Sequence, residues 1–297
     1  MGHEEMLILL WALQADGVST TTWKAKNNDE SEKNRRRIMD GHRAIACIHP
    51  LASMPPIITV TSSSSDQAKA AVTLGYLLDR LNCKYAFIGG FAWYLLGSTR
   101  PTQISLHVLV DTKDCDLLDL RERLMEFDEH FASSGIKLYY VKVAISELIG
   151  NLRDRQLLYA SKENVLIETL QAGRLGLPSV PEPKYFVEQE SGQTIPILHP
   201  SVLILTKMKR WAHSCESTFP KTVLKNASDQ ADLEFMIVWL AANDMQIEFE
   251  LYQGKTKEQL LDIVRVFRNR FIGNTELMAD LESIMKPADW ELLIVGT

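Results

Sequence analysis

The stretch that most constrains the fold runs from Tyr85 to Val110 and reads YAFIGGFAWYLLGSTRPTQISLHVLV. It predicts a short apolar strand, a glycine pair at Gly89 and Gly90, a helix, a polar turn and a second apolar strand. A glycine pair between a strand and a helix lets another backbone or a phosphate group come close. The second strand, Ile104–Val110, is nearly continuous in β-branched residues and leucine, which is typical of a strand covered on both faces.

Polar residues fill the turn ahead of the second strand. The residues that follow Gly97 include Ser98 and Thr102, which supply two hydroxyl groups, and Arg100, which supplies one fixed cation. Together with the glycine pair, this order of elements resembles the nucleotidyltransferase fold, the superfamily of polymerase-beta-like and antibiotic-modifying nucleotide transferases. The Gly-Ser-x-Arg-x-Thr run is similar to that of its minimal nucleotidyltransferase branch.

The second half of the chain adds to the resemblance. Residues 199–212, HPSVLILTKMKRWA, resemble the family helix that bears a lysine, here Lys207. Lys225, followed by Asp-x-x-Asp from Asp229, resembles the next helix, and Glu168 in ETLQAG resembles the strand with the third carboxylate. The resemblance implies nucleotide-binding roles for a set of residues along the chain: Gly89, Gly90, Ser98, Arg100, Lys207, Lys225 and Asp229.

The sequence departs from the family at the Asp-x-Asp pair that holds the metal ions. Spacing from the arginine places the two acids at Ile104 and Leu106. Strand alternation, with one inserted residue, places them at Ser105 and His107. Neither register holds a carboxylate, so Glu168 is the metal ligand that the resemblance leaves.

This departure bears directly on the chemistry. Nucleotidyl transfer uses two Mg²⁺ ions to orient the phosphates and neutralise the attacking and leaving oxygens. Mg²⁺ is a hard ion that requires oxygen ligands in a tight octahedron, whereas imidazole suits transition metals. We therefore expect weak Mg²⁺ binding or none, and we predict no other cofactor.

Three functions remain open from the sequence. The first is a pseudoenzyme with little or no metal-dependent transfer, which binds a nucleotide, another small molecule or a protein partner in the inherited cleft. The second is an active transferase that moves a nucleoside monophosphate from a triphosphate to a hydroxyl, using Glu168 with Asp111 or His107 in an altered metal site. The third is metal-independent catalysis by Ser105, His107 and Glu168 as hydroxyl, imidazole and carboxylate.

Charge and composition narrow the partners. The net charge of the 297 residues is -6, from 32 basic and 38 acidic side chains, so DNA binding is not predicted. The four cysteines lack metal-ligand spacing. The apolar run Met6–Leu13 is too short to span a bilayer, which needs about 20 residues. We expect a cytoplasmic protein, with the Arg35–Arg37 run as an alternative nuclear signal.

The predicted fold class is α+β, with a small mixed sheet flanked by helices and a C-terminal helical domain. We expect a low-order extension at 1–65, a nucleotidyltransferase-like core at 66–176, and a linker, hairpin and helical domain at 177–297. The remaining predicted elements, in chain order, are helices at Gln67–Leu81 and Asp114–Ser133 with Gly135 as C-cap, a strand at Lys137–Val143, a helical patch at Ser146–Arg155, a strand at Val165–Leu170, a hairpin at Tyr185–Gln189 and Thr194–Ile197, helices at Ser201–His213, Ala227–Asn243 and Thr256–Asn269, and a shorter helix near the C-terminus.

Overall fold

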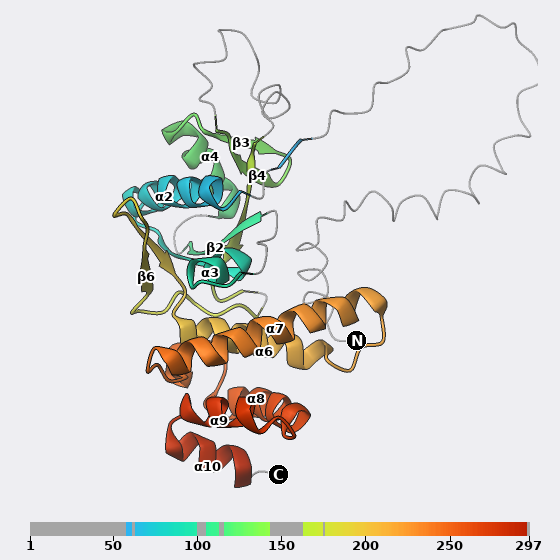
Figure 1. Ribbon diagram of the computed structural model, residues 1–297. Coiled ribbons are helices and arrows are strands. Elements are labelled where there is room, and N and C mark those ends of the chain that lie inside the picture. The colour runs from blue at the N-terminus through green and yellow to red at the C-terminus, as the bar shows by residue number, and fades with distance from the viewer. Residues whose placement is uncertain are drawn as a thin grey trace, which may run out of the picture. The chain divides into compact units, whose positions relative to one another are not determined.

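The structure, a computed structural model, describes residues 58–60, 63–99, 105–112, 116–142, 163–174 and 176–295. All of them belong to one compact unit, Ile58–Thr297 (Figure 1). The arginine run, the Met6–Leu13 segment and the helical patch predicted at Ser146–Arg155 lie outside the described residues. No helix among the described residues has both the length and the apolar character needed to cross a membrane.

Seven strands form a single mixed sheet in the order β3-β4-β5-β2-β1-β7-β6. The β2–β5 and β1–β7 pairs are parallel, and the other neighbours are antiparallel. The strands are β1 (Lys84–Ile88), β2 (Ser105–Asp111), β3 (Phe131–Ser134), β4 (Lys137–Tyr140), β5 (Val165–Gln171), β6 (Tyr185–Glu188) and β7 (Thr194–Ile197).

Strand β2 lies at the centre of the sheet, between β5 and β1. Its first six residues are buried, which explains why its sequence is almost continuously apolar. Parallel pairing sets His107 beside Glu168 of β5, and antiparallel pairing sets His107 beside Ile88 of β1. The end of β1, the start of β2 and the middle of β5 therefore meet at one place.

Three helices pack against the sheet: α2 (Ser64–Arg80), α3 (Gly89–Leu95) and α4 (Leu117–Phe127). Helix α2 is capped by the Ser63 side chain, which accepts from the backbone N–H of Asp66, and it buries a stripe that includes Leu74, Leu77 and Leu78. Asp116 caps α4 because its side chain accepts hydrogen bonds from two backbone N–H groups, those of Leu118 and Asp119.

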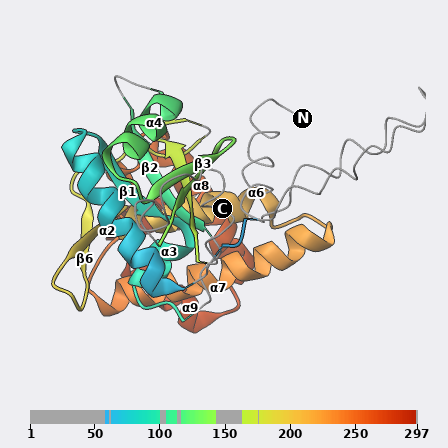
Figure 2. The same cartoon turned by 90° about the horizontal axis from the view of Figure 1, so that it is seen from above.

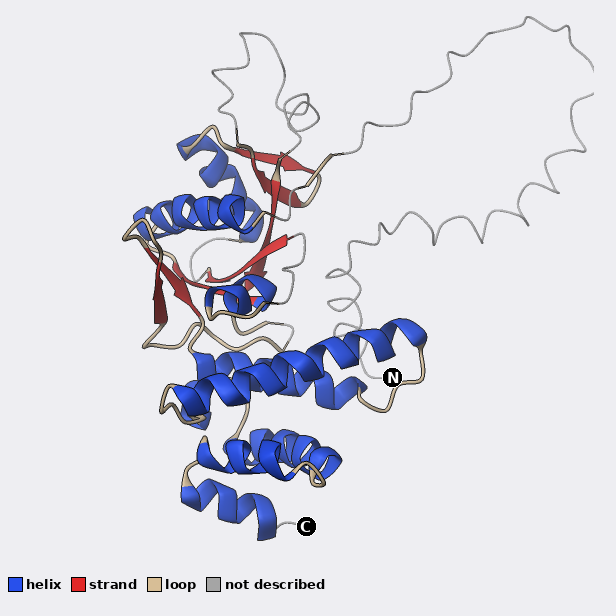
Figure 3. Cartoon of the chain, in the orientation of Figure 1, coloured by secondary structure: helices blue, strands red, loops and turns tan. Residues whose placement is uncertain are grey.

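Most of the described chain after β7 is helical. Figure 3 shows the strands gathered in one part of this unit and the later helices in another. Helices α6 and α7 pack on one another, α8 contacts α6, and α9 contacts α7 (Figures 1 and 2). The bounds are α6 (Pro200–Ser214), α7 (Pro220–Ala242), the 3-10 turn η3 (Phe249–Leu251), α8 (Lys257–Phe271), α9 (Thr275–Ser283) and α10 (Pro287–Val295).

These observations confirm the α+β class and the mixed sheet, and they place the β6–β7 hairpin where the sequence predicts it. The hairpin joins the same sheet as β1, because Phe87 pairs with Ile197 and the backbone N–H of Leu198 donates to the carbonyl of Phe87 at 3.0 Å. The sheet therefore continues past residue 177.

One predicted element is wrong. The sequence predicted a single helix at Asp114–Ser133, but α4 ends at Phe127 and residues 131–134 form strand β3. Phe131 lies four residues after Phe127, which mimics helical spacing, yet it pairs with Tyr140 in a hairpin. Gly135, predicted as a helix C-cap, has φ +62° and lies in the turn of that hairpin.

Candidate functional site

Ser105, His107 and Glu168 converge on neighbouring strands. Ser105 and His107 are two residues apart on β2 and share a face, while Leu106 between them is completely buried. Of the two registers that the sequence left open for the missing acid pair, the one at Ser105 and His107 holds the residue that contacts Glu168, because His107 contacts Glu168 and Ser105 contacts His107. We call these three residues the β2–β5 site.

The contacts within the β2–β5 site all use one ring nitrogen. The Nε2 atom of His107 lies 2.7 Å from Glu168 Oε2 and 3.1 Å from Ser105 Oγ. The side chain of His107 is 7% exposed and that of Glu168 is 23% exposed. The pair is thus shielded from bulk water on the histidine side and open on the carboxylate side.

The proton on this nitrogen decides what the site can do. An ionised carboxylate only accepts hydrogen bonds, so His107 Nε2 must carry the proton that it donates to Glu168. A protonated Nε2 has no lone pair with which to take the hydroxyl proton of Ser105. In a serine nucleophile activated by a general base, the carboxylate and the hydroxyl contact opposite nitrogens of the histidine ring. Here both contact the same nitrogen, so this arrangement does not activate Ser105.

Gly89 shapes the other side of the histidine ring. Its φ is +70°, and a Cβ atom placed on it would lie 2.6 Å from His107 Nδ1. The glycine therefore leaves room for the imidazole, which fills the space beside the start of α3. Gly97 has φ +96°, but nothing lies within 4 Å of an added Cβ atom. Glycine is therefore favoured at this position by the backbone conformation alone.

Asp111, the predicted substitute metal ligand, lies at the far end of β2. It pairs with Lys84, whereas His107 pairs with Glu168 and Ile88. Four residues of strand separate Asp111 from His107, about 13 Å at a rise of about 3.3 Å per residue. One ion therefore does not bind Asp111 together with Glu168.

The fold has a counterpart among solved structures. The crystal structure of an antigenic nucleotidyltransferase-like protein from Paracoccidioides brasiliensis is similar to this chain, with a TM-score of 0.53 and 17% sequence identity. The match covers 75% of this chain and 95% of that one. The fold is nucleotidyltransferase-like. No protein-family model matches the sequence, and no curated protein matches it closely enough to count as a relative.

A nucleotidyltransferase-like fold implies Mg²⁺, so the donors of the β2–β5 site can be tested against that ion. They comprise one carboxylate, one imidazole and one hydroxyl, and the carboxylate oxygen nearest the centre is already bonded to His107. Mg²⁺ prefers an octahedron of oxygens and several negative charges. The donor set does not fit. Across the described ranges, no group of three or more histidine, cysteine or acidic side chains is arranged to hold a metal ion.

The predicted nucleotide-binding residues fall into two places. Gly89 and Gly90 begin α3, beside His107. Ser98 follows α3 and is buried, with its backbone N–H donating to the carbonyl of Trp93 at 3.0 Å. Arg100 lies outside the described residues. The second place is the contact between α6 and α7, which holds Lys207, Lys225 and Asp229.

Lys207 and Asp229 lie in a buried group of charges that we call the ion-pair cluster: Lys207, Arg210, Asp229 and Asp232. Lys207 Nζ lies 2.6 Å from Asp232 Oδ2 and 3.2 Å from Asp229 Oδ1, and Arg210 Nε donates to Asp229 Oδ2 at 2.8 Å. Arg210 Nη2 also pairs with Asp229 Oδ1. Burial lowers the pKa of Lys207, and the carboxylates of Asp229 and Asp232 oppose that shift. With Lys207 protonated, two cations face two carboxylates and the cluster balances its own charge.

Burial and charge act in opposite directions on Asp229. Burial alone would raise the pKa of its carboxyl, but the positive charges of Lys207 and Arg210, with Lys225 one helical turn away, hold that pKa below its ordinary value. Asp229 is completely buried and remains ionised because two cations share it. The nucleotide-binding role of Lys207 and Asp229 stays a prediction.

Arg210 and Trp93 are partners of this cluster that no sequence motif marked. Trp93 Nε1 donates to the backbone carbonyl of Asp232 at 3.2 Å, and Lys207 Nζ lies 5.0 Å from the centre of the indole ring. Trp93 belongs to α3, so the cluster joins that helix to α6 and α7. One signal was present in the sequence, because Lys207 and Arg210 are three residues apart on one helix and share a face.

Proposed function

We propose that this nucleotidyltransferase-fold protein binds a nucleotide without carrying out ordinary magnesium-dependent nucleotidyl transfer. The observation that supports this most directly is the contact of 2.7 Å between His107 Nε2 and Glu168 Oε2. The resemblance leads us to expect the acid pair on this strand, and here the one carboxylate of the β2–β5 site accepts a hydrogen bond from an imidazole instead.

The cost of removing the acids follows from electrostatics. Two carboxylates bring two negative charges beside a doubly charged ion, whereas Ser105 contributes none and His107 contributes none or a positive charge. In a partly buried site, the loss of each carboxylate weakens the free energy of Mg²⁺ binding by several kcal/mol. The ring of His107 also occupies the space beside Gly89.

The test compares metal dependence directly. Calorimetry with ATP, CTP, GTP and UTP, each with Mg²⁺, with Mn²⁺ and with a chelator, measures whether binding needs a metal ion. We expect at least one nucleotide to bind equally with and without metal, and no release of pyrophosphate. Tight binding that requires Mg²⁺ and disappears in Glu168→Ala would overturn the proposal in favour of an active transferase.

Restoring the acids provides the matching gain-of-function variant. In the double variant Ser105→Asp, His107→Asp, both carboxylates would face Glu168, and we expect Mg²⁺ affinity to rise by at least about tenfold, the equivalent of about 1.4 kcal/mol. Asp111→Asn, at the other end of β2, is the control and should leave Mg²⁺ affinity unchanged. A wild-type protein that already binds Mg²⁺ as tightly as the double variant would contradict the proposal.

A further inference from the structure

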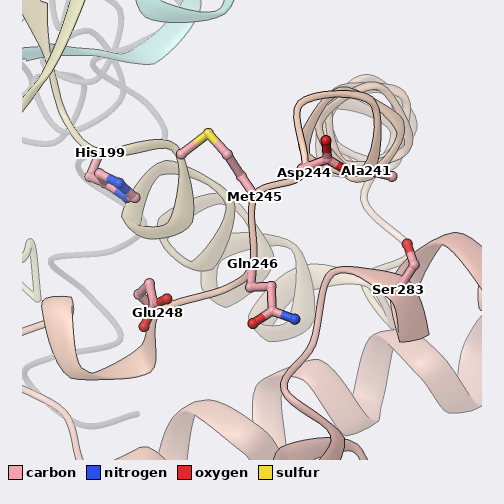
Figure 4. Close-up of a pocket in the computed structure, with 7 residues that line it drawn as sticks. All are labelled: His199, Ala241, Asp244, Met245, Gln246, Glu248 and Ser283. Carbon is pink, nitrogen blue, oxygen red and sulfur yellow. The ribbon is translucent and has the colours of Figure 1, made fainter.

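A cavity of about 470 Å³ lies where α6 begins and where α7 and α9 end (Figure 4). Its lining includes His199, Asp244, Gln246 and Glu248, with Ser283 at the end of α9. None of these residues belongs to the β2–β5 site or to the ion-pair cluster. The volume is within the range of small-molecule sites, about 300–1,000 Å³.

The segment that crosses this cavity is held on both sides. Ser201 Oγ of α6, which is completely buried, donates to the backbone carbonyl of Gln246 at 2.8 Å. The backbone N–H of Ile247 donates to the carbonyl of Ile284 at the end of α9, at 2.7 Å, and the Ile247 side chain is completely buried. The cavity floor is therefore fixed before any ligand arrives, which lowers the entropy lost on binding.

The electrostatic character of the cavity is negative. Helix α7 ends at Ala242 and α9 ends at Ser283, and the C-terminal end of a helix carries a partial negative charge. The carboxylate of Glu248 is already neutralised by Lys286 Nζ at 2.6 Å. Burial lowers the pKa of His199 below its ordinary value, against the opposing charge of Glu248, so the ring adds no positive charge near neutral pH.

Asp244 is an exposed carboxylate at the rim of this cavity. No described residue pairs with its side chain, and it stands two residues beyond the last residue of α7, at the negative end of that helix. Its φ is +51°, a left-handed conformation in which glycine and asparagine are the residues usually found. A carboxylate at this position opposes the helix dipole, and a bound cation would offset that cost.

We propose that this cavity binds a small organic cation, a primary amine or guanidinium compound, through Asp244. The amide oxygen of Gln246 and the Oγ of Ser283, whose proton is already donated to the carbonyl of Asp280, supply further acceptors for the N–H groups of the ligand. The site is separate from the β2–β5 site, so the proposal does not depend on nucleotide binding.

The experiment uses the full chain and a pair of probes that differ in charge alone. Calorimetry compares 1,5-diaminopentane with 1,5-pentanediol, which has the same carbon chain without charge; spermidine and agmatine extend the amine and guanidinium series. We expect the diamine to bind, the diol not to bind, and the affinity for the diamine to fall as salt rises. Inorganic phosphate is the anionic control and should not bind to this cavity.

Asp244→Asn removes the charge and keeps the shape, and asparagine suits a left-handed position at least as well as aspartate, so the variant should fold. We expect it to weaken diamine binding by at least about tenfold, as for the loss of a charge-assisted hydrogen bond. Glu216→Gln, an exposed acid just beyond the opposite end of α6, is the matched control. Equal binding to wild type and Asp244→Asn, or no binding of the diamine, spermidine or agmatine at millimolar concentration, would overturn the proposal.

Discussion

The β2–β5 site and the ion-pair cluster use their charges differently. The cluster places two carboxylates against two cations in the protein interior, and Asp229 at its centre is completely buried. The β2–β5 site has a single carboxylate, partly exposed, whose nearest partner is an imidazole. The cluster thus pairs its charges with one another inside the protein, whereas the β2–β5 site leaves its single carboxylate partly exposed to solvent.

The largest effect should come from breaking the cluster. Asp229→Ala leaves Lys207 and Arg210 buried without their shared carboxylate, and we expect the free energy of unfolding to fall by about 3–5 kcal/mol. Urea denaturation of the two proteins measures it. Glu216→Gln, which removes an exposed ion pair at 3.9 Å from Arg270, is the control and should cost less than about 1 kcal/mol. Equal losses in the two variants would contradict the contrast between the sites.

The ion-pair cluster should also make the stability of the protein depend on pH in the acid range. The pKa of Asp229 is held below its ordinary value of 3.8, so its contribution to stability is fully present above that pH and is lost as pH falls through the lower pKa of the folded state. The difference in free energy of unfolding between wild type and Asp229→Asn should therefore become smaller as the pH drops below about 4. A gap in urea denaturation that stays constant down to pH 2 would show that the carboxyl charge is not the cause.

An intermediate effect is expected at the glycine beside the histidine. Gly89→Ala puts a Cβ atom at φ +70° and 2.6 Å from His107 Nδ1, whereas Gly97→Ala meets only the backbone cost, about 1–2 kcal/mol. We expect Gly89→Ala to lower the free energy of unfolding by more than Gly97→Ala does.

A second substitution tests whether the loss comes from the clash between the added Cβ atom and the His107 ring. In the double variant Gly89→Ala, His107→Ala the ring is gone, so the excess loss should disappear and the two sites should show a coupling energy. Additive losses would mean that His107 does not fill the space beside Gly89.

The smallest effect is expected at Glu168. Glu168→Gln keeps a hydrogen-bonding group next to His107 and removes the charge from a partly exposed position, so we expect a loss of about 1 kcal/mol. Thermal unfolding measures the change. A loss as large as that of Asp229→Ala would place Glu168 among the structural charges and would weaken its assignment to a ligand site.

The sequence predicted most elements, because apolar periodicity reports burial. The prediction failed where residues on different elements happened to have helical spacing. Phe127 and Phe131 are four residues apart, but a turn separates them and Phe131 belongs to strand β3. It also placed the start of α7 at Ala227, although the helix begins at Pro220, where proline occupies its first turn. The residues before Ala227 are mostly exposed, so no apolar stripe marked them.

The site was predictable in part. A period of two along β2 put Ser105 and His107 on one face, and the resemblance supplied Glu168. The contact between His107 and Glu168 depends on the register of β2 against β5, which pairs strands more than 50 residues apart and leaves no local trace in the sequence. The cavity near Asp244 was not predicted at all, because it is built from the ends of three helices.

The parallel pairing of β7 with β1 has a practical consequence. A fragment that stopped near residue 177 would lack β6 and β7 and would present the outer side of β1 as an open edge, with Phe87 and its neighbours exposed. Such a piece should aggregate when expressed by itself and should recover when the remaining part is supplied as a separate polypeptide. The β6–β7 hairpin, through Leu198, therefore belongs in one polypeptide with β1 in any truncation of this protein.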